Sequence, residues 1–264
     1  MAADRISSFT FSPVRPKRRT SDKLIFISCE GSVTEWEYFE KIVNLAFENV
    51  SSRVRVINIL EDVLKKKSKQ RTNEENRLIS SVSPNNLLIK MDDYKAKFSE
   101  EYDFDHNPDD EFWLVMDVDE HTNASLVDAE GKSNFDKWNA VLEKCREKNY
   151  QYAVSNPFFE LWLLLHFDDI NAEDRKYAVN SSHPYEPTGH FRERLADLNV
   201  PLKKDKHISE RHYQNYSKEA IIAAIHRAES LDSESGCDYP DDLGSTVYRL
   251  LKSIKEIDDQ YEVN

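Results

Sequence analysis

Four short strand-like runs, each followed by a segment of helical periodicity, constrain the fold of this chain more than any other feature. Continuous apolar runs are typical of strands buried on both faces, and their alternation with amphipathic helices is typical of a parallel sheet. We therefore predict an α/β fold with a mainly parallel four-stranded sheet and flanking helices. The predicted strands are residues 24–27, 54–60, 112–116 and 150–154.

The helices between these strands carry start signals of their own. Ser32-Val33-Thr34-Glu35 fits a capping box, and Ser83-Pro84 precedes a second helical stretch. A third, residues 135–148, has an amphipathic pattern. Asn156 and Pro157 suit the N-cap and first position of a helix over residues 158–167.

After Asp168 the chain becomes helical and charged, without a clean linker. Helices are predicted at residues 190–198, 219–231 and 246–257. We expect residues 169–264 to pack as a helical region on the core formed by residues 23–168, within one unit. Residues 1–22 carry a basic cluster among Ser, Thr and Pro, and we interpret them as a flexible arm.

Composition excludes several classes of protein. No two of the five glycines have the spacing of a glycine-rich nucleotide loop, and a net charge of −13 argues against coating nucleic acid by charge alone. The three widely spaced cysteines and the histidines form no zinc pattern, which favours reduced thiols in a cytoplasm. No apolar run approaches the length of a membrane span, so no membrane association is expected.

Acidic residues close two of the predicted strands. Glu30 follows the first, and Asp117 and Asp119 follow the third, where alternation along an extended backbone places both aspartates on one side. Sites in open parallel sheets form beyond the carboxyl ends of the strands. Converging carboxylates repel one another unless a cation neutralises them, and Mg²⁺ prefers oxygen ligands. The pattern therefore favours a metal site for phosphoryl transfer, although solvated loop acids are the alternative.

Two further acids have a structural and a functional interpretation. Glu35 is either the partner in its capping box or a metal ligand, and the residues alone leave both open. Glu160 lies in the otherwise apolar helix of residues 158–167, where a carboxylate needs a partner such as a metal, a lysine or a phosphate-bound water. We predict that Asn156 and Glu160 support the metal site or position the substrate.

Three motifs together resemble the RloB family. They are I-S-C-E-G-x-x-T-E-x-x-Y-F from Ile27 to Phe39, D-V-D at residues 117–119, and S-N-P-x-F-E-L-W-L-L-L-H-F from Ser155 to Phe167. The resemblance covers most of the chain from about Lys23 onward. Phe158 stands where the family usually has a cysteine, which we interpret as a packing variation.

The resemblance implies a Toprim-like fold and assigns roles by position. Glu30 would be a metal ligand or general acid/base, Asp117 and Asp119 metal ligands, and Glu35 a secondary acid near the metal. The segment of residues 203–206 resembles a lysine-containing segment of the family. Lys204 is the first choice for a catalytic lysine that contacts phosphate. Whether Lys206 takes this role instead is left open.

The resemblance also implies a function. It predicts a Mg²⁺-dependent (or Mn²⁺-dependent) nuclease that cleaves RNA, including tRNA, or DNA. Such a nuclease would be the effector of a bacterial anti-phage, abortive-infection system with an ATPase partner encoded nearby, and a homodimer is left open. The alternative is a non-catalytic subunit that binds nucleic acid or a partner; a phosphatase-like enzyme is less favoured. The basic runs at residues 15–19, 65–71 and 203–206 would assist substrate contact or dock an acidic partner.

Overall fold

The computed structural model describes residues 23–31, 33–57, 83–99, 104, 107–179, 189–232 and 238–262. Within these residues one sheet has five strands in the order β2-β1-β3-β4-β5. Four strands are parallel to their neighbours and β5 is antiparallel to β4, so the predicted α/β class with a mainly parallel sheet is confirmed. The strands are β1 (Ile25–Cys29), β2 (Val54–Ile57), β3 (Glu111–Asp117), β4 (Gln151–Asn156) and β5 (Gly244–Ser245).

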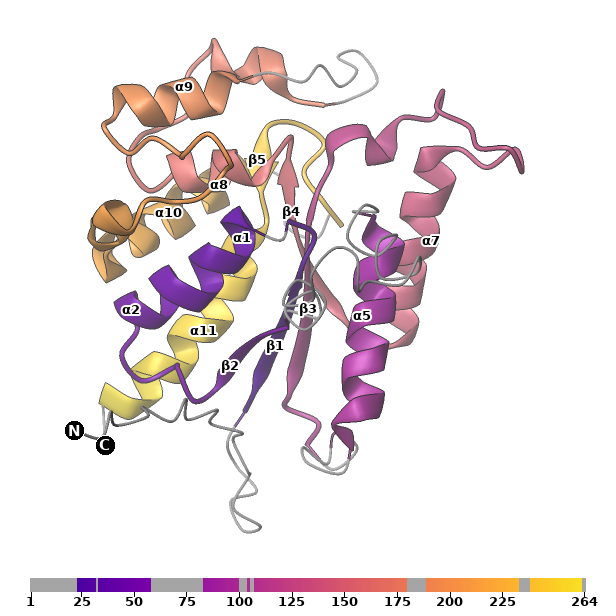
Figure 1. Cartoon of the computed structure of the whole chain (residues 1–264), viewed down its shortest axis with the longest axis horizontal. Coiled ribbons are helices and arrows are strands. Elements are labelled where there is room, and N and C mark those ends of the chain that lie inside the picture. Colours follow the sequence, from indigo (N-terminus) through magenta and orange to yellow (C-terminus); the bar gives the residue numbers. More distant parts are fainter. Residues whose placement is uncertain are drawn as a thin grey trace, which may run out of the picture.

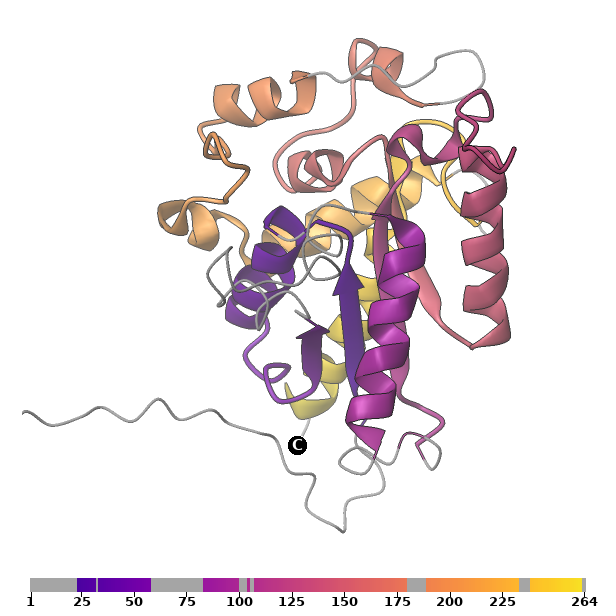
Figure 2. The same ribbon diagram turned by 45° about the vertical axis from the view of Figure 1, so that its right-hand side comes forward.

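Helices cover both faces of the sheet (Figure 1). Two of them, α5 (Pro84–Lys97) and α7 (Asn134–Glu147), lie together on one face. The turned view in Figure 2 shows α5 in front of the sheet and α11 behind it. The elements on the second face are α1 (Thr34–Glu37), a π-helical segment (Tyr38–Val43), α2 (Asn44–Ala46), α8 (Phe159–Leu164), α9 (His190–Asp197), α10 (Lys218–Leu231) and α11 (Val247–Glu262).

Strand β1 separates two hydrophobic cores, and all five of its residues are buried. Ile25 and Ile27 face the core that α8, α10 and α11 close, whereas Phe26 faces the core under α5 and α7. Since alternate side chains of a strand point to opposite faces, a strand buried on both sides needs apolar residues throughout. This explains the continuous apolar run from which the strand was predicted.

The C-terminal helices share the first of these cores with the sheet. Leu195 of α9, Ile225 of α10 and Leu250 of α11 belong to the same buried cluster as Ile27. No helix in the described part of the chain has the length and apolar character needed to cross a membrane.

The fifth strand was not predicted. Gly244 and Ser245 pair with Asn156 and Ser155 of β4, and the Thr246 amide then donates to the Val154 carbonyl at 2.8 Å. A two-residue strand is too short to produce a hydrophobic pattern, so the sequence suggested only the start of the helix that follows, which begins at Val247.

Two helix starts differ from the predictions. Strand β4 continues through Asn156 and α8 begins at Phe159, so Phe158 occupies the N-cap position expected for Asn156. Helix α1 begins at Thr34 after Val33, without a side-chain cap, and Ser32 of the predicted capping box lies outside the described residues. The basic arm of residues 1–22, the strand end at 58–60, the basic run at 65–71 and Cys237 also lie outside them.

A buried ion pair ties α11 to the neighbouring elements of the second face. Asp258, which is 1% exposed, accepts a bond from Lys218 Nζ of α10 at 2.8 Å and one from the Asn49 amide at 3.1 Å. Burial alone would raise the Asp258 pKa, but the bonds from Lys218 and Asn49 outweigh it and hold that pKa below its ordinary value.

We predict that Asp258→Ala lowers the free energy of unfolding by about 2–3 kcal/mol at neutral pH, because it leaves part-buried donors without their acceptor. A depressed carboxyl pKa stabilises the folded state above the ordinary aspartate range, and this stabilisation is lost as the pH falls through the folded pKa. Urea denaturation measures both effects. Asp259→Ala, which removes a more exposed partner of Lys255 on the same helix, is the control and should cost under about 0.5 kcal/mol. Equal costs for the two variants would contradict the prediction.

Candidate functional site

The pairing of β1 with β3 brings the two predicted acidic strand ends together. Cys29 is in register with Val115, and the next residue, Glu30, donates its amide to the Val115 carbonyl at 2.9 Å. The Glu30 carboxylate turns back to β3, where Oε2 accepts the Asp117 amide at 3.2 Å. The acidic strand ends can converge only if the two strands are neighbours, and they are, with Glu30 beside Asp117.

Glu35 reaches the same edge from the first turn of α1. Its carboxylate lies over Gly31, so close that a Cβ at residue 31 would stand 1.8 Å from Glu35 Oε2. The Glu35 pKa is raised from 4.5 to about 7, by burial first and then by the charges of Glu160 and Glu30. The capping-box interpretation of Glu35 does not describe this placement, since α1 begins at Thr34 and Glu35 is its second residue.

Asp117 lies at the centre of the acidic edge. Its pKa is raised well above the ordinary aspartate value, by burial first and then by the charges of Glu35, Glu30, Glu160 and Asp119. Five carboxylates, from the ends of β1 and β3, the residues that follow them, α1 and α8, thus interact at one edge of the sheet. We call Glu30, Glu35, Asp117, Asp119 and Glu160 the acidic edge.

Asp119 reaches this edge by a different geometry from the one predicted. Strand β3 ends at Asp117, and Asp119 has a positive φ of 37° at the start of a 3₁₀ turn (Asp119–Thr122). Strand alternation therefore does not place Asp119 beside Asp117; the tight turn does. Val118 between them is buried at 1% exposure, as expected, and its amide donates to the Ser155 carbonyl at 2.9 Å.

Two basic side chains next to Glu30 were missed in the sequence. His121 Nε2 lies 2.6 Å from Glu30 Oε1, and its ring stacks on Trp138 with an interplanar angle of 8°. Lys90 of α5 is buried, and burial lowers its pKa against the raising effects of Cys29 and Glu30. The available signals were a lysine among the apolar positions of α5 and a histidine two residues after the D-V-D motif.

The predicted lysine segment contributes Lys206 to the acidic edge. Its charge lowers the Glu35 pKa, and its carbonyl accepts the Thr34 hydroxyl at 2.8 Å. Lys206 has a positive φ of 68° in the turn between Leu202 and Ile208, which form an isolated bridge. Both lysines are exposed, but Lys204 is not among the main charges that act on Glu35 or Asp117, so the electrostatics favour Lys206 over the first choice.

Asn156 and Glu160 have different surroundings. The Asn156 side chain is fully buried, donating to the Val179 and Pro240 carbonyls at 3.0 Å each and accepting the Val179 amide at 2.9 Å. These bonds join two loops to β4 and fix the backbone at the carboxyl end of that strand. Glu160 is half-buried and interacts with Glu35 and Asp117.

A buried hydrogen-bond chain holds the two helices that carry Glu35 and Glu160. The Tyr38 hydroxyl lies 2.9 Å from His166 Nε2, and His166 Nδ1 lies 2.9 Å from the Trp162 carbonyl. Burial lowers the His166 pKa to about 3, so the ring is neutral. Because a carbonyl only accepts, Nδ1 carries the proton and Nε2 accepts from Tyr38. We call these three residues the Tyr38–His166 clamp.

The ligand atoms that the acidic edge offers are of the kind that a hard divalent cation binds. They are carboxylate oxygens, which Mg²⁺ prefers, and their mutual repulsion would be relieved by a positive charge. In the described part of the chain, however, no three Asp, Glu, His or Cys side chains are gathered into a complete cation site. An ion would therefore be held by one or two of Asp117, Asp119 and Glu35, with water or phosphate oxygens completing its shell, as is common for Mg²⁺.

We predict that Gly31→Ala displaces the Glu35 carboxylate without unfolding the protein. The new methyl group would occupy the position of the carboxylate, which is the end of a flexible side chain and can move. Divalent-cation binding, measured by Mn²⁺ titration, should weaken, while the free energy of unfolding should change by under about 1 kcal/mol. A variant that binds Mn²⁺ like the unsubstituted protein would show that the Glu35 position is unimportant.

We predict that Glu35 lowers the free energy of unfolding in a pH-dependent way. Because its folded pKa of about 7 exceeds its ordinary value of 4.5, the folded state binds more protons than the unfolded state between these values. Stability should therefore be highest below the ordinary value and fall as the pH rises through the folded pKa. In EDTA, Glu35→Gln should be more stable than the unsubstituted protein at about pH 8 and similar at about pH 5 in urea denaturation. Parallel pH profiles of the two proteins would contradict the prediction.

Comparison with known proteins identifies the family. No curated protein and no solved structure matches the chain. The family model described as RloB-like protein matches residues 25–254, which span the sheet, the acidic edge, the Tyr38–His166 clamp and the first half of α11. This match covers most of the chain, and the chain therefore belongs to the RloB-like family.

Proposed function

We propose that the chain is a Mg²⁺-dependent or Mn²⁺-dependent nuclease that hydrolyses phosphodiester bonds at the acidic edge. The observation that carries the proposal is the convergence of Glu30, Glu35 and Asp117 at the carboxyl ends of β1 and β3, with raised pKa values for Glu35 and Asp117. Buried like charges destabilise a fold, and their presence at the edge where parallel sheets form sites indicates a functional demand.

The proposed roles follow from the contacts of each side chain. One or two of Asp117, Asp119 and Glu35 would hold the cation, which when bound would stabilise charge on the phosphate and activate a water molecule. Glu30 is fixed by the Asp117 amide and His121, so its carboxylate is oriented to accept a proton from the attacking water. Lys206 would contact the phosphate near Glu35, consistent with its charge acting on that residue.

The proposed substrate is a nucleic acid, either RNA, including tRNA, or DNA. With a net charge of −13, the chain needs short-range contacts bridged by a cation rather than a broad basic surface. As a family-level proposal, the nuclease would act in the bacterial cytoplasm as the effector of an anti-phage, abortive-infection system, regulated by an ATPase partner encoded nearby. A homodimer is compatible with this arrangement.

A second candidate function is a non-catalytic subunit that binds nucleic acid or a partner. One observation favours it, since the described residues do not form a complete three-ligand cation site. Cleavage by the purified chain separates the two functions, because a binding subunit would retain substrate without cutting it.

We predict that the purified protein, alone or with its neighbouring ATPase, cuts DNA, total RNA or tRNA in Mg²⁺ or Mn²⁺ and not in EDTA. Glu30→Gln and Asp117→Asn should each reduce the cleavage rate by about 100-fold or more, because each removes a group that acts on the reacting atoms. Glu130→Gln makes the same chemical change at an exposed loop position and should leave the rate unchanged. Absence of cutting with the ATPase present, or full activity of Asp117→Asn, would overturn the proposal.

A further inference from the structure

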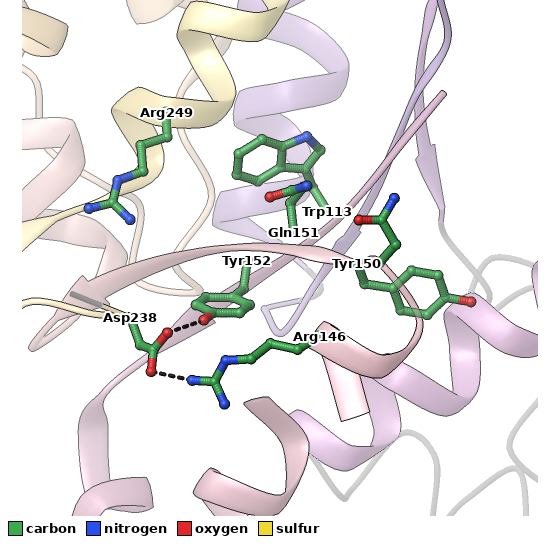
Figure 3. A pocket seen from close by; sticks show the side chains of 8 residues that line it. Trp113, Arg146, Tyr150, Gln151, Tyr152, Asp238 and Arg249 are labelled. Atoms are coloured by element: carbon green, nitrogen blue, oxygen red, sulfur yellow. Dashed lines mark hydrogen bonds and ion pairs between the residues drawn. The ribbon is translucent and has the colours of Figure 1, made fainter. Parts of the chain in front are cut away.

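A pocket of about 400 Å³ lies at the start of β4, away from the acidic edge (Figure 3). Its walls include Trp113 of β3, Gln151 and Tyr152 of β4, and two arginines from different helices. Trp113 pairs with Gln151, whereas Asp117 pairs with Ser155 four residues later. At about 3.3 Å per residue, the pocket and the acidic edge are roughly 13 Å apart along the strand.

The pocket includes an open stretch of the β4 edge. The short strand β5 covers only Ser155 and Asn156, and the Val154 peptide group is bonded to Thr246 through both its amide and its carbonyl. Because bonding directions alternate along a strand, the Tyr152 N–H and C=O point to the same side as those of Val154. No strand in the described part of the chain pairs with Tyr152 there.

This opening is too short for an added peptide strand. Thr246 closes it at Val154, and the Tyr150 amide is already bonded to the Cys145 carbonyl at 2.8 Å. Within the described residues, the Tyr152 N–H and C=O are left as one adjacent donor and acceptor. A planar heterocycle with a donor and an acceptor on one edge, such as a nucleobase, matches this pair, and the side-chain amides of Asn149 and Gln151 lie in the same wall.

The two arginines stand on opposite faces of β4. Figure 3 shows Arg146 beside Tyr152 and Asp238, with Arg249 on the other side of the ribbon near Trp113. Asp238 accepts bonds from both Arg146 and the Tyr152 hydroxyl, which fixes this guanidinium in the wall. Arg249 is oriented by Asp232 at 2.7 Å. A guanidinium has five N–H donors in a planar arrangement that suits phosphate. The ion pair with Asp238 therefore leaves Arg146 with further N–H groups that can donate to a phosphate.

We propose that this pocket binds a nucleotide. The base would meet the Tyr152 peptide group and lie against the aromatic wall, and the phosphate would contact Arg146. The volume lies at the lower end of the range for small-ligand sites, which suits a mononucleotide. The nucleotide could be free in solution or the terminal residue of a nucleic-acid strand, since both present the same base and phosphate. This inference is independent of the cation chemistry proposed for the acidic edge.

Isothermal titration calorimetry tests the proposal with full-length Asp117→Asn protein in EDTA, so that its result does not depend on cleavage. The probes are AMP, CMP, GMP and UMP, the matching nucleosides, and a tetranucleotide with a 5′-phosphate. At least one nucleotide should bind, and its nucleoside should bind at least about 10-fold more weakly because the phosphate contacts are lost. Binding of mononucleotides alone identifies a free ligand, and tighter binding of the tetranucleotide identifies a strand end.

Variants added to this protein locate the bound nucleotide. Arg146→Ala should weaken binding by at least about 10-fold, and Gln151→Trp, which fills the pocket from an exposed position, should abolish it. Arg175→Ala is the matched control, because Arg175 is as exposed as Arg146 and also pairs with an aspartate. Circular dichroism checks that each variant is folded. The proposal is overturned if no probe binds, or if binding is unchanged in both pocket variants.

Discussion

The parallel pairing of β1 with β3 is the constraint on which the rest of the structure depends. It carries the hydrophobic core on both faces of the sheet, and its register places Glu30 against Asp117. Since β1 is buried throughout, a shift of one residue would exchange the side chains of its two faces. The same packing that stabilises the fold therefore fixes the first two carboxylates of the acidic edge.

The other acidic residues lie on segments packed against that sheet. Bringing their carboxylates together lowers the stability of the folded state. Burial and mutual repulsion raise the pKa values of Glu35 and Asp117, which means that the folded state disfavours their ionised forms. The bonds around Glu30 and the charge of Lys206 offset part of this cost. Such repulsion lowers the stability of the folded state, and strongly perturbed pKa values of this kind cluster at functional sites in proteins.

Sequence patterns predicted most of the fold and much of the acidic edge, for identifiable reasons. Strand β1 is buried on both faces, which leaves a continuous apolar run in the sequence, and α7 buries one face, which leaves a helical pattern. Strand β5 is too short to leave one, and the positive φ of Asp119 follows from a tight turn that no periodicity reports. His121 and Lys206 approach through tertiary packing, so only the folded chain distinguishes them from other basic residues.

The Tyr38–His166 clamp has a consequence for how the protein responds to acidity. His166 uses one ring nitrogen as donor and the other as acceptor, so a second proton on the ring would break its bond with Tyr38. With a pKa of about 3, the imidazole keeps the same charge across the range in which Glu35 titrates. The clamp between α1 and α8 is thus insulated from proton concentration, and acidity acts on the carboxylates while this part of their support stays unchanged.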